Sequence, residues 1–566
     1  MTPFNFASLF TMKFFLAFIF CMVLGIISAQ VQDYQDKYPN GNIRSEGKYL
    51  NGYEDGAWKY FYETGKIQEE SNYSRGKLNG SVKRYHPNGQ LMVEGYFKYD
   101  KQDSLQRTFS AEGKKVEEGN YALGKKLGKW NYFFSSGDTM MMEEYRDSSV
   151  LVWTYFSAPG KSSVKDGNGV IEELFANGKP HKITHYLHGI PDGSFEERFS
   201  DGVIFQAGNY KAGRQEGEWK ENFPSGKIKR LAHYKDGLLE GNFEEYYSNA
   251  RLSVKGQYAL GRKTGNWVWY VDSGNKDMEG AFLNDVQHGE WIYYYANGNK
   301  QYWGNYTNGQ MDGFWQYQYW GGEKWKAGNF SSGKKNGKWT FWFENGQALM
   351  EGNFKNDLEE GEWKSWYEKG APKDIGNYHE GKMNGPWLGY YPNGVKNYEG
   401  SWTIRKAQDQ MAEKWADLYQ MEKRDSSLMQ KTGDVKTGKW SYWRDSGMIE
   451  RMETYDANGE LNGSAETYNI AGKIESKGAY KNGKPDGEWK YYYPFGALMR
   501  ECGYQEGKLD GKSTIYNERG KVIEECTYKN NKREGMYTSY DEKTGKVLIK
   551  QEYKNGRVKE TKSSPK

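Results

Sequence analysis

The chain has 566 residues, of which 70 are glycine, 13 are proline and 17% are aromatic. Disordered chains are poor in aromatic residues, so this composition excludes a largely disordered protein. Short strands joined by glycine turns fit it instead. The 79 basic and 75 acidic residues nearly balance. This balance gives no electrostatic argument for nucleic acid or an anionic membrane as the partner.

The first 29 residues are typical of an export signal. Lys13 precedes an apolar run from Phe14 to Ile27, and small residues follow up to Ala29. A basic start, a short apolar run and a small-residue cleavage site define a secretory signal peptide. The run is shorter than the roughly 20 residues that span a bilayer. We therefore predict cleavage near Ala29 and export to the periplasm, outer-membrane surface or exterior, with a retained anchor as the alternative.

An aromatic residue then recurs at twenty positions, almost always 24 residues apart. These positions are Tyr49, Tyr73, Phe97, Tyr121, Tyr145, Tyr186, Tyr210, Tyr234, Tyr258, Phe282, Tyr306, Phe330, Phe354, Tyr378, Trp402, Tyr455, Tyr480, Tyr504, Tyr528 and Tyr553. A fixed period of this kind indicates a repeat protein whose units stack on their neighbours.

Residues 289–312 illustrate one repeat. Residues 291–295 alternate in character as a strand does, and Asn297-Gly298 predicts a tight type I′ turn. Residues 301–306 form the expected return strand, and a looser turn leads to the next repeat. The predicted fold is all-β: an elongated array of about twenty antiparallel β-hairpin repeats of 24 residues, forming a twisted sheet with one inserted helix.

A two-residue loop would place Trp291 opposite Gly304, with Tyr306 diagonal to it on the same face. We therefore expect each indole to lie over the glycine of its own hairpin and against the recurrent aromatic residue. A three-residue loop would change this parity.

These residues resemble a known repeat. Glycine, tryptophan and Asn-Gly, followed by Glu-Gly-x-Tyr and Asn-Gly-Lys, look like the MORN repeat variant over roughly residues 32–560, apart from two insertions. The resemblance implies an elongated antiparallel sheet that serves protein or membrane association. Many bacterial proteins of this kind are labelled antitoxin-like. Membrane association is thus implied by the resemblance but is not supported by the charge.

Two insertions interrupt the period. About 17 extra residues near 145–168 predict an extra hairpin or a bulged loop. Residues 403–437 carry apolar side chains at steps of three and four, which predicts an amphipathic helix. This helix either packs on the sheet or presents a partner-binding face that includes Trp415. The predicted order of domains is signal peptide 1–29, repeats 30–402, helical insertion 403–437, repeats 438–560 and tail 561–566.

No constellation of residues predicts catalysis, so we expect neither enzyme activity nor a cofactor. His181, His185 and His188 form the only histidine cluster, but a metal site needs a further ligand and supporting contacts. We expect ordinary strand and turn histidines. Cys502 and Cys526 are one repeat apart, about 9–10 Å if two strands separate them. That is too far for a disulfide, so two free thiols are predicted.

The face opposite the tryptophans is the predicted partner-binding surface. Tyr294, Trp342, Trp366 and Tyr390 would form a ladder of rings across the repeats, able to anchor a peptide or stack on sugars. The alternative is that these rings only cover the sheet. We predict an exported, non-catalytic surface that binds or scaffolds another protein or a cell-envelope component. A glycan-binding adhesin and an antitoxin-like inhibitor of a protein partner are the alternatives.

Overall fold

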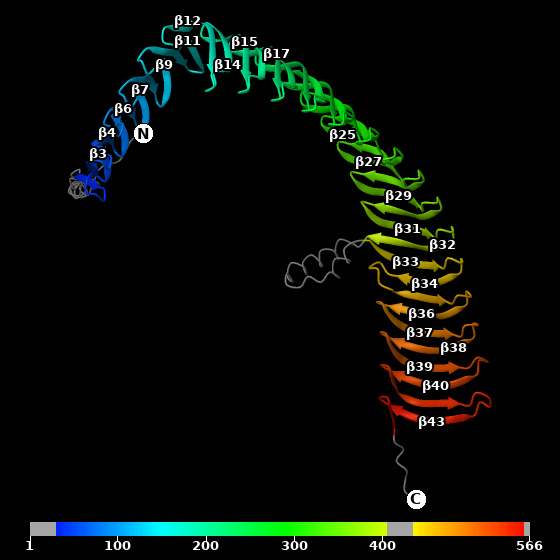
Figure 1. The fold of residues 1–566 in the computed structure, drawn as a ribbon. Helices are drawn as coiled ribbons and strands as arrows, with labels where there is room; N and C mark the ends of the chain where they lie inside the picture. The colour runs from blue at the N-terminus through cyan, green and yellow to red at the C-terminus, as the bar shows by residue number, and fades with distance from the viewer. Residues whose placement is uncertain (1–29, 405–433, 560–566) are drawn as a thin grey trace, which may run out of the picture. The chain divides into compact units, whose positions relative to one another are not determined.

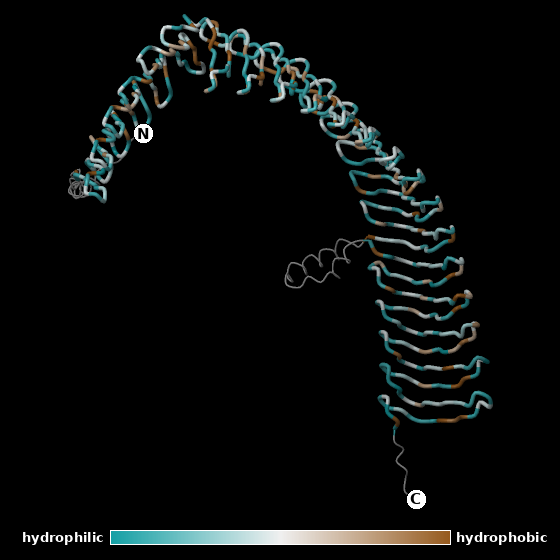
Figure 2. The backbone as a smooth tube through the Cα atoms, viewed as in Figure 1, coloured by the Kyte–Doolittle hydropathy of each residue, from teal (hydrophilic) through white to brown (hydrophobic). Residues whose placement is uncertain are grey.

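The computed structural model describes residues 30–404 and 434–559 (Figure 1). These residues contain 44 strands, assigned to one antiparallel open sheet in which strands adjacent in sequence pair. The chain divides into two compact units, Met1–Leu252 with Gln257–Arg262 and Ser253–Gly256 with Lys263–Lys566. Hydrophobic residues occur in short stretches throughout the repeats (Figure 2).

The first 22 strands are β1 (Val31–Lys37), β2 (Ile43–Leu50), β3 (Tyr53–Phe61), β4 (Ile67–Ser74), β5 (Lys77–Tyr85), β6 (Leu91–Lys98), β7 (Lys101–Phe109), β8 (Lys115–Ala122), β9 (Lys125–Phe133), β10 (Thr139–Arg146), β11 (Ser149–Ala158), β12 (Lys161–Lys165), β13 (Asn168–Leu174), β14 (Pro180–Leu187), β15 (Ile190–Arg198), β16 (Ile204–Lys211), β17 (Arg214–Asn222), β18 (Ile228–Lys235), β19 (Leu238–Tyr246), β20 (Leu252–Ala259), β21 (Arg262–Tyr270) and β22 (Lys276–Leu283).

The other 22 are β23 (Val286–Tyr294), β24 (Lys300–Thr307), β25 (Gln310–Gln318), β26 (Lys324–Ser331), β27 (Lys334–Trp342), β28 (Ala348–Lys355), β29 (Leu358–Trp366), β30 (Pro372–His379), β31 (Lys382–Tyr390), β32 (Lys396–Ile404), β33 (Asp434–Trp443), β34 (Ile449–Tyr455), β35 (Gly463–Tyr468), β36 (Ile474–Lys481), β37 (Lys484–Tyr492), β38 (Leu498–Gln505), β39 (Lys508–Tyr516), β40 (Val522–Lys529), β41 (Lys532–Arg533), β42 (Gly535–Tyr540), β43 (Val547–Lys554) and β44 (Arg557–Val558).

The all-β prediction is confirmed, but the expected count of about forty strands is too low. Each of the twenty recurrent aromatic residues lies on the return strand of a hairpin. The extra strands have three origins. The insertion after Tyr145 forms the additional strands β11 and β12, one strand is split at Glu534 into β41 and β42, and β44 adds a short final pair.

The predicted helical insertion lies outside the described residues except at its two ends, and there the prediction is wrong. Thr403 and Ile404 close β32, while residues 434–437 open β33. Ile404 pairs with Asp434 in this ladder. Both ends of the insertion are therefore held by backbone hydrogen bonds of the sheet, and the described residues include no helix.

The turn inside most hairpins has three residues, as between β23 and β24. The Tyr295 N–H donates to the carbonyl oxygen of Asn299, and the Gly298 N–H donates to that of Tyr295, both at 2.8 Å. Gly298 has a φ of +90°, whereas Asn297 does not adopt positive φ. This is a type I turn followed by a glycine bulge, so the predicted type I′ turn at Asn297-Gly298 is wrong.

The two-residue geometry occurs instead at the turn between repeats, which was expected to be the looser one. Asn308 and Gly309 both have positive φ, +50° and +75°, and Thr307 pairs with Gln310 across them. Two consecutive positive φ values define the type I′ turn.

The predicted pairing of Trp291 with Gly304 is nevertheless confirmed. A three-residue loop alone would shift the pairing by one residue, so that Trp291 and Gly304 would no longer share a face. A bulge between Tyr293 and Tyr294 shifts the register a second time. The two shifts cancel, so the expected residues share a face although the loop length was wrong.

The indole covers the glycine of the preceding hairpin rather than that of its own. A Cβ atom added to Gly280 would overlap the Trp291 ring, and one added to Gly304 would overlap Trp315. The Nε1–H of Trp291 also donates to the backbone oxygen of Ala281, at 3.0 Å. The tryptophan therefore joins one repeat to the repeat before it.

Eleven tryptophans share this contact, and each is at most 7% exposed. The pairs are Gly47–Trp58, Gly119–Trp130, Gly208–Trp219, Gly256–Trp267, Gly280–Trp291, Gly304–Trp315, Gly328–Trp339, Gly352–Trp363, Gly376–Trp387, Gly400–Trp440 and Gly478–Trp489. Rings on a single sheet are thus buried by contacts between repeats.

Where the tryptophan of this contact is replaced by a smaller ring, the glycine is replaced by a larger residue. Ala232 stands opposite Phe243, and Thr184 stands opposite Phe195. Phenylalanine is smaller than tryptophan, so a residue larger than glycine fits beneath it.

We expect Gly304→Ala to destabilise β24 and β25 by about 1–3 kcal/mol, the usual cost of overpacking. Replacing Trp315 by Phe in the same chain should recover most of the loss, because Ala232 and Phe243 already form such a pair. Hydrogen exchange of the β24 and β25 amides, measured by mass spectrometry, checks both changes. Asn305→Ala on the opposite face is the control, and equal exchange in all variants would contradict the packing.

Candidate partner-binding surface

We call the face that carries the eleven buried tryptophans the tryptophan face. In the second unit it holds a ladder of rings with successive centroids 4.2–6.4 Å apart. The ladder runs through Trp267, Trp269, Trp291, Tyr293, Tyr302, Tyr317, Trp339, Phe341 and Trp363. Offset and tilted rings at such distances attract one another beyond their burial.

Lysines of the chain cover several of these tryptophans. In each case the lysine stands four residues before the tryptophan, and its Nζ lies within cation–π distance of the ring. The pairs are Lys126–Trp130 at 3.9 Å, Lys263–Trp267 at 4.8 Å, Lys335–Trp339 at 5.2 Å and Lys436–Trp440 at 4.7 Å, measured to the ring centroid.

The ladder changes the acidity of its phenols. Burial, with a smaller contribution from the neighbouring Tyr302, raises the pKa of Tyr317 from 10.0 to about 12. Burial also raises the pKa of Tyr293, and its hydrogen bond with the Tyr306 hydroxyl adds to this shift. These phenols stay neutral at pH values where an exposed tyrosine ionises.

Tyr294, Trp342, Trp366 and Tyr390 lie on the opposite face and are half-buried. Tyr294 donates its hydroxyl to Glu279 at 2.5 Å, and lysines approach the rings of Tyr294 and Trp342. No ring contact joins the four residues within the described ranges, so the continuous ladder lies on the tryptophan face. Their role in partner binding stays a prediction, and Trp415 lies outside the described residues.

Two exposed tryptophans near β25 and β26 are ones that the repeat pattern did not single out. Trp320, in the turn between β25 and β26, is 55% exposed, and Trp325 on β26 is 41% exposed. The Trp320 ring lies 5.1 Å from Tyr295, and the Trp325 ring lies 6.1 Å from Tyr319. We call these four residues the turn cluster.

The sequence contains a signal for the turn cluster. The positions 24 residues before and after Trp320 hold Ala296 and Glu344. Trp320 thus departs from the small and the charged residue that the two neighbouring repeats carry in this turn.

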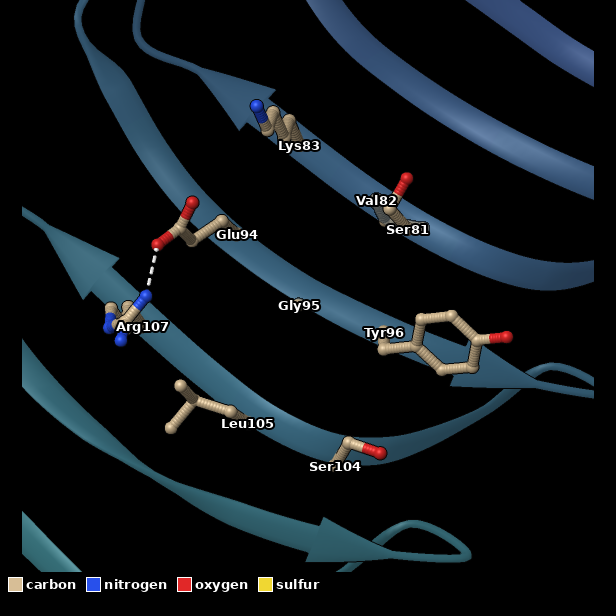
Figure 3. A pocket seen from close by; sticks show the side chains of 9 residues that line it. All are labelled: Ser81, Val82, Lys83, Glu94, Gly95, Tyr96, Ser104, Leu105 and Arg107. Atoms are coloured by element: carbon tan, nitrogen blue, oxygen red, sulfur yellow. Dashed lines mark hydrogen bonds and ion pairs between the residues drawn. The ribbon is translucent and has the colours of Figure 1, made fainter.

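The first unit has shallow charged depressions. One of about 340 Å³ lies over β5–β7 and is bordered by Lys83, Glu94 and Arg107, with Glu94 and Arg107 paired at 2.8 Å (Figure 3). Another, of about 480 Å³, is bordered by Glu46 and Lys59, the equivalents of Glu94 and Arg107 two repeats earlier. Each depression is bordered by charges of both signs, so neither favours a partner of one particular charge.

The three histidines of the predicted cluster do not share a site. His181 approaches Glu197 at 3.7 Å, His185 bonds to Ser194 at 2.9 Å, and His188 lies in a turn. No group of three potential metal ligands occurs within residues 30–404 and 434–559.

Cys502 and Cys526 are free and buried, as predicted. Each occupies the position that glycine holds in most repeats, and Cys502 stands opposite the small residue Ser513. Burial raises the pKa of both thiols, which lowers their reactivity.

No helix in the described part of the chain is long and apolar enough to cross a membrane. The family model described as the MORN repeat variant matches eight stretches, residues 54–75, 78–99, 215–236, 287–310, 335–356, 359–380, 485–506 and 509–530. The predicted resemblance is confirmed at these stretches. No curated protein matches the chain.

Two solved structures are similar to the chain at 10% identity. They are titled "Crystal Structure of TcdB2-TccC3-Cdc42" and "Crystal Structure of TcdB2-TccC3 without hypervariable C-terminal region". The matches cover 93% of this chain in both cases, but 30% and 34% of the other chains, with TM-scores of 0.13 and 0.12. The chain thus spans about a third of their length, and such scores identify neither its fold nor its function.

We expect Tyr317 to contribute to alkaline unfolding. Because folding raises its pKa from 10.0 to about 12, its contribution to stability is complete below pH 10 and is lost as the pH rises towards 12. Tyr317→Phe cannot ionise, so it should lose less stability over this interval. Urea unfolding at pH 9 and pH 11, followed by circular dichroism, measures the difference, and equal losses in both proteins would contradict the assignment.

Proposed function

We propose that this protein is exported and acts, without catalysis, as a surface that binds or scaffolds another protein. The observation that supports this most directly is the turn cluster. It places Trp320 and Trp325 at the surface, 55% and 41% exposed, each beside a tyrosine ring. Exposed aromatic groups of this kind are typical of protein contact sites, where tryptophan and tyrosine supply much of the binding energy.

The repeat array supports a scaffolding role. Strands adjacent in sequence pair along each unit, so the same side-chain positions recur on one face at every hairpin. Repeat proteins use such extended surfaces for binding. The near balance of basic and acidic residues favours a partner recognised by shape and aromatic contact over one recognised by net charge.

Two other functions use the same features. Exposed tryptophan rings also stack on sugars, so a glycan-binding adhesin of the cell envelope is the second candidate. An antitoxin-like inhibitor of a protein partner is the third, suggested by the labels of proteins with similar repeats. It requires a cytoplasmic location, which the proposed export opposes.

We expect the double substitution Trp320→Ala and Trp325→Ala to weaken partner binding roughly 30-fold, the effect of losing about 2 kcal/mol at a hot spot. The partner would first be identified by proximity crosslinking in the native host, and its Kd then measured by calorimetry. Phe495→Ala is the matched control, because Phe495 is another exposed turn ring, stacked on Tyr493. An unchanged Kd in the double variant would remove the turn cluster from the binding site. A glycan as the captured molecule would favour the adhesin.

Cell fractionation tests export. We expect the mature chain, beginning near residue 30, in the periplasm, outer membrane or medium, with its N-terminus determined by Edman sequencing. A variant with Lys13→Glu and an acidic residue within the apolar run should remain cytoplasmic, because signal peptides need a basic start and an apolar core. Wild-type protein of full length in the cytosol would overturn export and favour the antitoxin-like function.

A further inference from the structure

The ring ladder of the tryptophan face has a gap. Ser365 occupies the position that Tyr293, Tyr317 and Phe341 hold in the three preceding repeats. A cavity of about 200 Å³ lies there, bordered by Trp363 and Trp387. The cavity is therefore the space of one missing ring between two buried indoles.

The cavity has one acidic side chain in its lining, Asp374. Met350, Tyr378 and Asp374 complete the lining on this face. Asp374 accepts hydrogen bonds from the Ser365 hydroxyl at 3.1 Å and the Tyr398 hydroxyl at 2.7 Å. A carboxylate can accept about four hydrogen bonds, so Asp374 is held in place and can accept more.

Negative charge surrounds Tyr378. Burial raises the pKa of Tyr378, and the nearby carboxylates of Glu359, Asp434 and Asp374 raise it further. These groups, together with the ring faces, create an environment that favours a cation.

In four of the eleven repeats with a buried tryptophan, a lysine of the chain supplies this cation, and the repeat before the cavity is one of them. Lys335 Nζ lies 5.2 Å from the Trp339 ring and 4.7 Å from the Phe354 ring. Its equivalent one repeat later is Glu359, which precedes Trp363 by four residues. A carboxylate thus stands at the sequence position that Lys335 holds one repeat earlier.

The next repeat also lacks this lysine, because Met383 stands four residues before Trp387. No described lysine or arginine lies over the rings of Trp363, Tyr378 or Trp387.

Two lysines border the cavity, but their ammonium groups are engaged elsewhere. Lys364 pairs with Glu362 at 2.7 Å, and Lys373 lies 5.8 Å from the Tyr367 ring. Neither supplies the missing cation.

We propose that this cavity binds the alkylammonium end of a lysine side chain presented by a partner protein. Aromatic rings would contact the methylene groups and the cation, and Asp374 would accept a hydrogen bond from the ammonium group. The partner as the source of the lysine rests on the proposed protein-binding function. The preference of the cavity for an alkylammonium group does not, and it can be tested without the partner.

The test uses the full chain labelled with 5-fluorotryptophan, with n-butylammonium as the probe and 1-butanol as its neutral counterpart. Fluorine NMR resolves tryptophans individually, and the Trp363→Phe and Trp387→Phe variants assign the two resonances. We expect saturable shifts of these two resonances with n-butylammonium, and roughly tenfold weaker binding of 1-butanol. Trp339, which Lys335 already covers, should not shift.

Two variants remove the site in different ways. Ser365→Tyr restores the missing ring, as at Tyr317, and Glu359→Lys restores the internal cation, as at Lys335. Each should abolish the saturable shift while leaving the other tryptophan resonances in place. If one variant does not fold, the other variant still tests whether the cavity binds the alkylammonium group.

The proposal is overturned if n-butylammonium causes no saturable shift, if 1-butanol binds equally well, or if a folded variant binds the probe as the wild type does. Binding of the probe without any protein partner being found would uphold the cavity and count against the proposed protein-binding function. The two ideas therefore fail separately.

Discussion

A single layer of sheet has no second layer to cover its large side chains, and the contact between tryptophan and the preceding glycine answers that constraint. Each indole lies over the backbone of the hairpin before it and donates to a carbonyl there, as Trp291 does to Ala281. Burial is therefore achieved between repeats rather than within them. In this arrangement the stability of a hairpin depends on its neighbour, as in other linear repeat proteins.

The same contact provides a criterion for telling structural aromatic residues from functional ones. Rings that fill the ladder or cover a glycine are explained by packing. Trp320 and Trp325 are not, because they are largely exposed and stand where other repeats carry smaller residues. The cavity at Ser365 is the converse case, in which a ring that the three preceding repeats carry is missing. Recognition is best sought at such departures from the repeat, where packing no longer determines the residue.

The period and the hairpin architecture follow from the sequence, because both are repeated about twenty-fold. The pairing of Trp291 with Gly304 was predicted from a two-residue loop, and it holds because the three-residue loop and the bulge cancel. The turn types do not follow. Asn297-Gly298 and Asn308-Gly309 are the same dipeptide, yet only the second has two positive φ values. The difference comes from the bulge at Tyr293, which no local pattern signals. Likewise, strand pairing does not reveal whether an indole covers the glycine of its own hairpin or that of the preceding one. The 24-residue period does not reveal that Trp325 is exposed.

Pairing between strands adjacent in sequence also determines how a unit would respond to force. A chain pulled at its two ends loads the hydrogen bonds of a hairpin one after another rather than all together. Each hairpin that opens releases 24 residues, or roughly 80 Å of extended chain. The tryptophan contacts set the resistance of each step, and hairpins without them yield first. We expect such a unit to lengthen in steps of about one repeat and to recover its length as the hairpins refold.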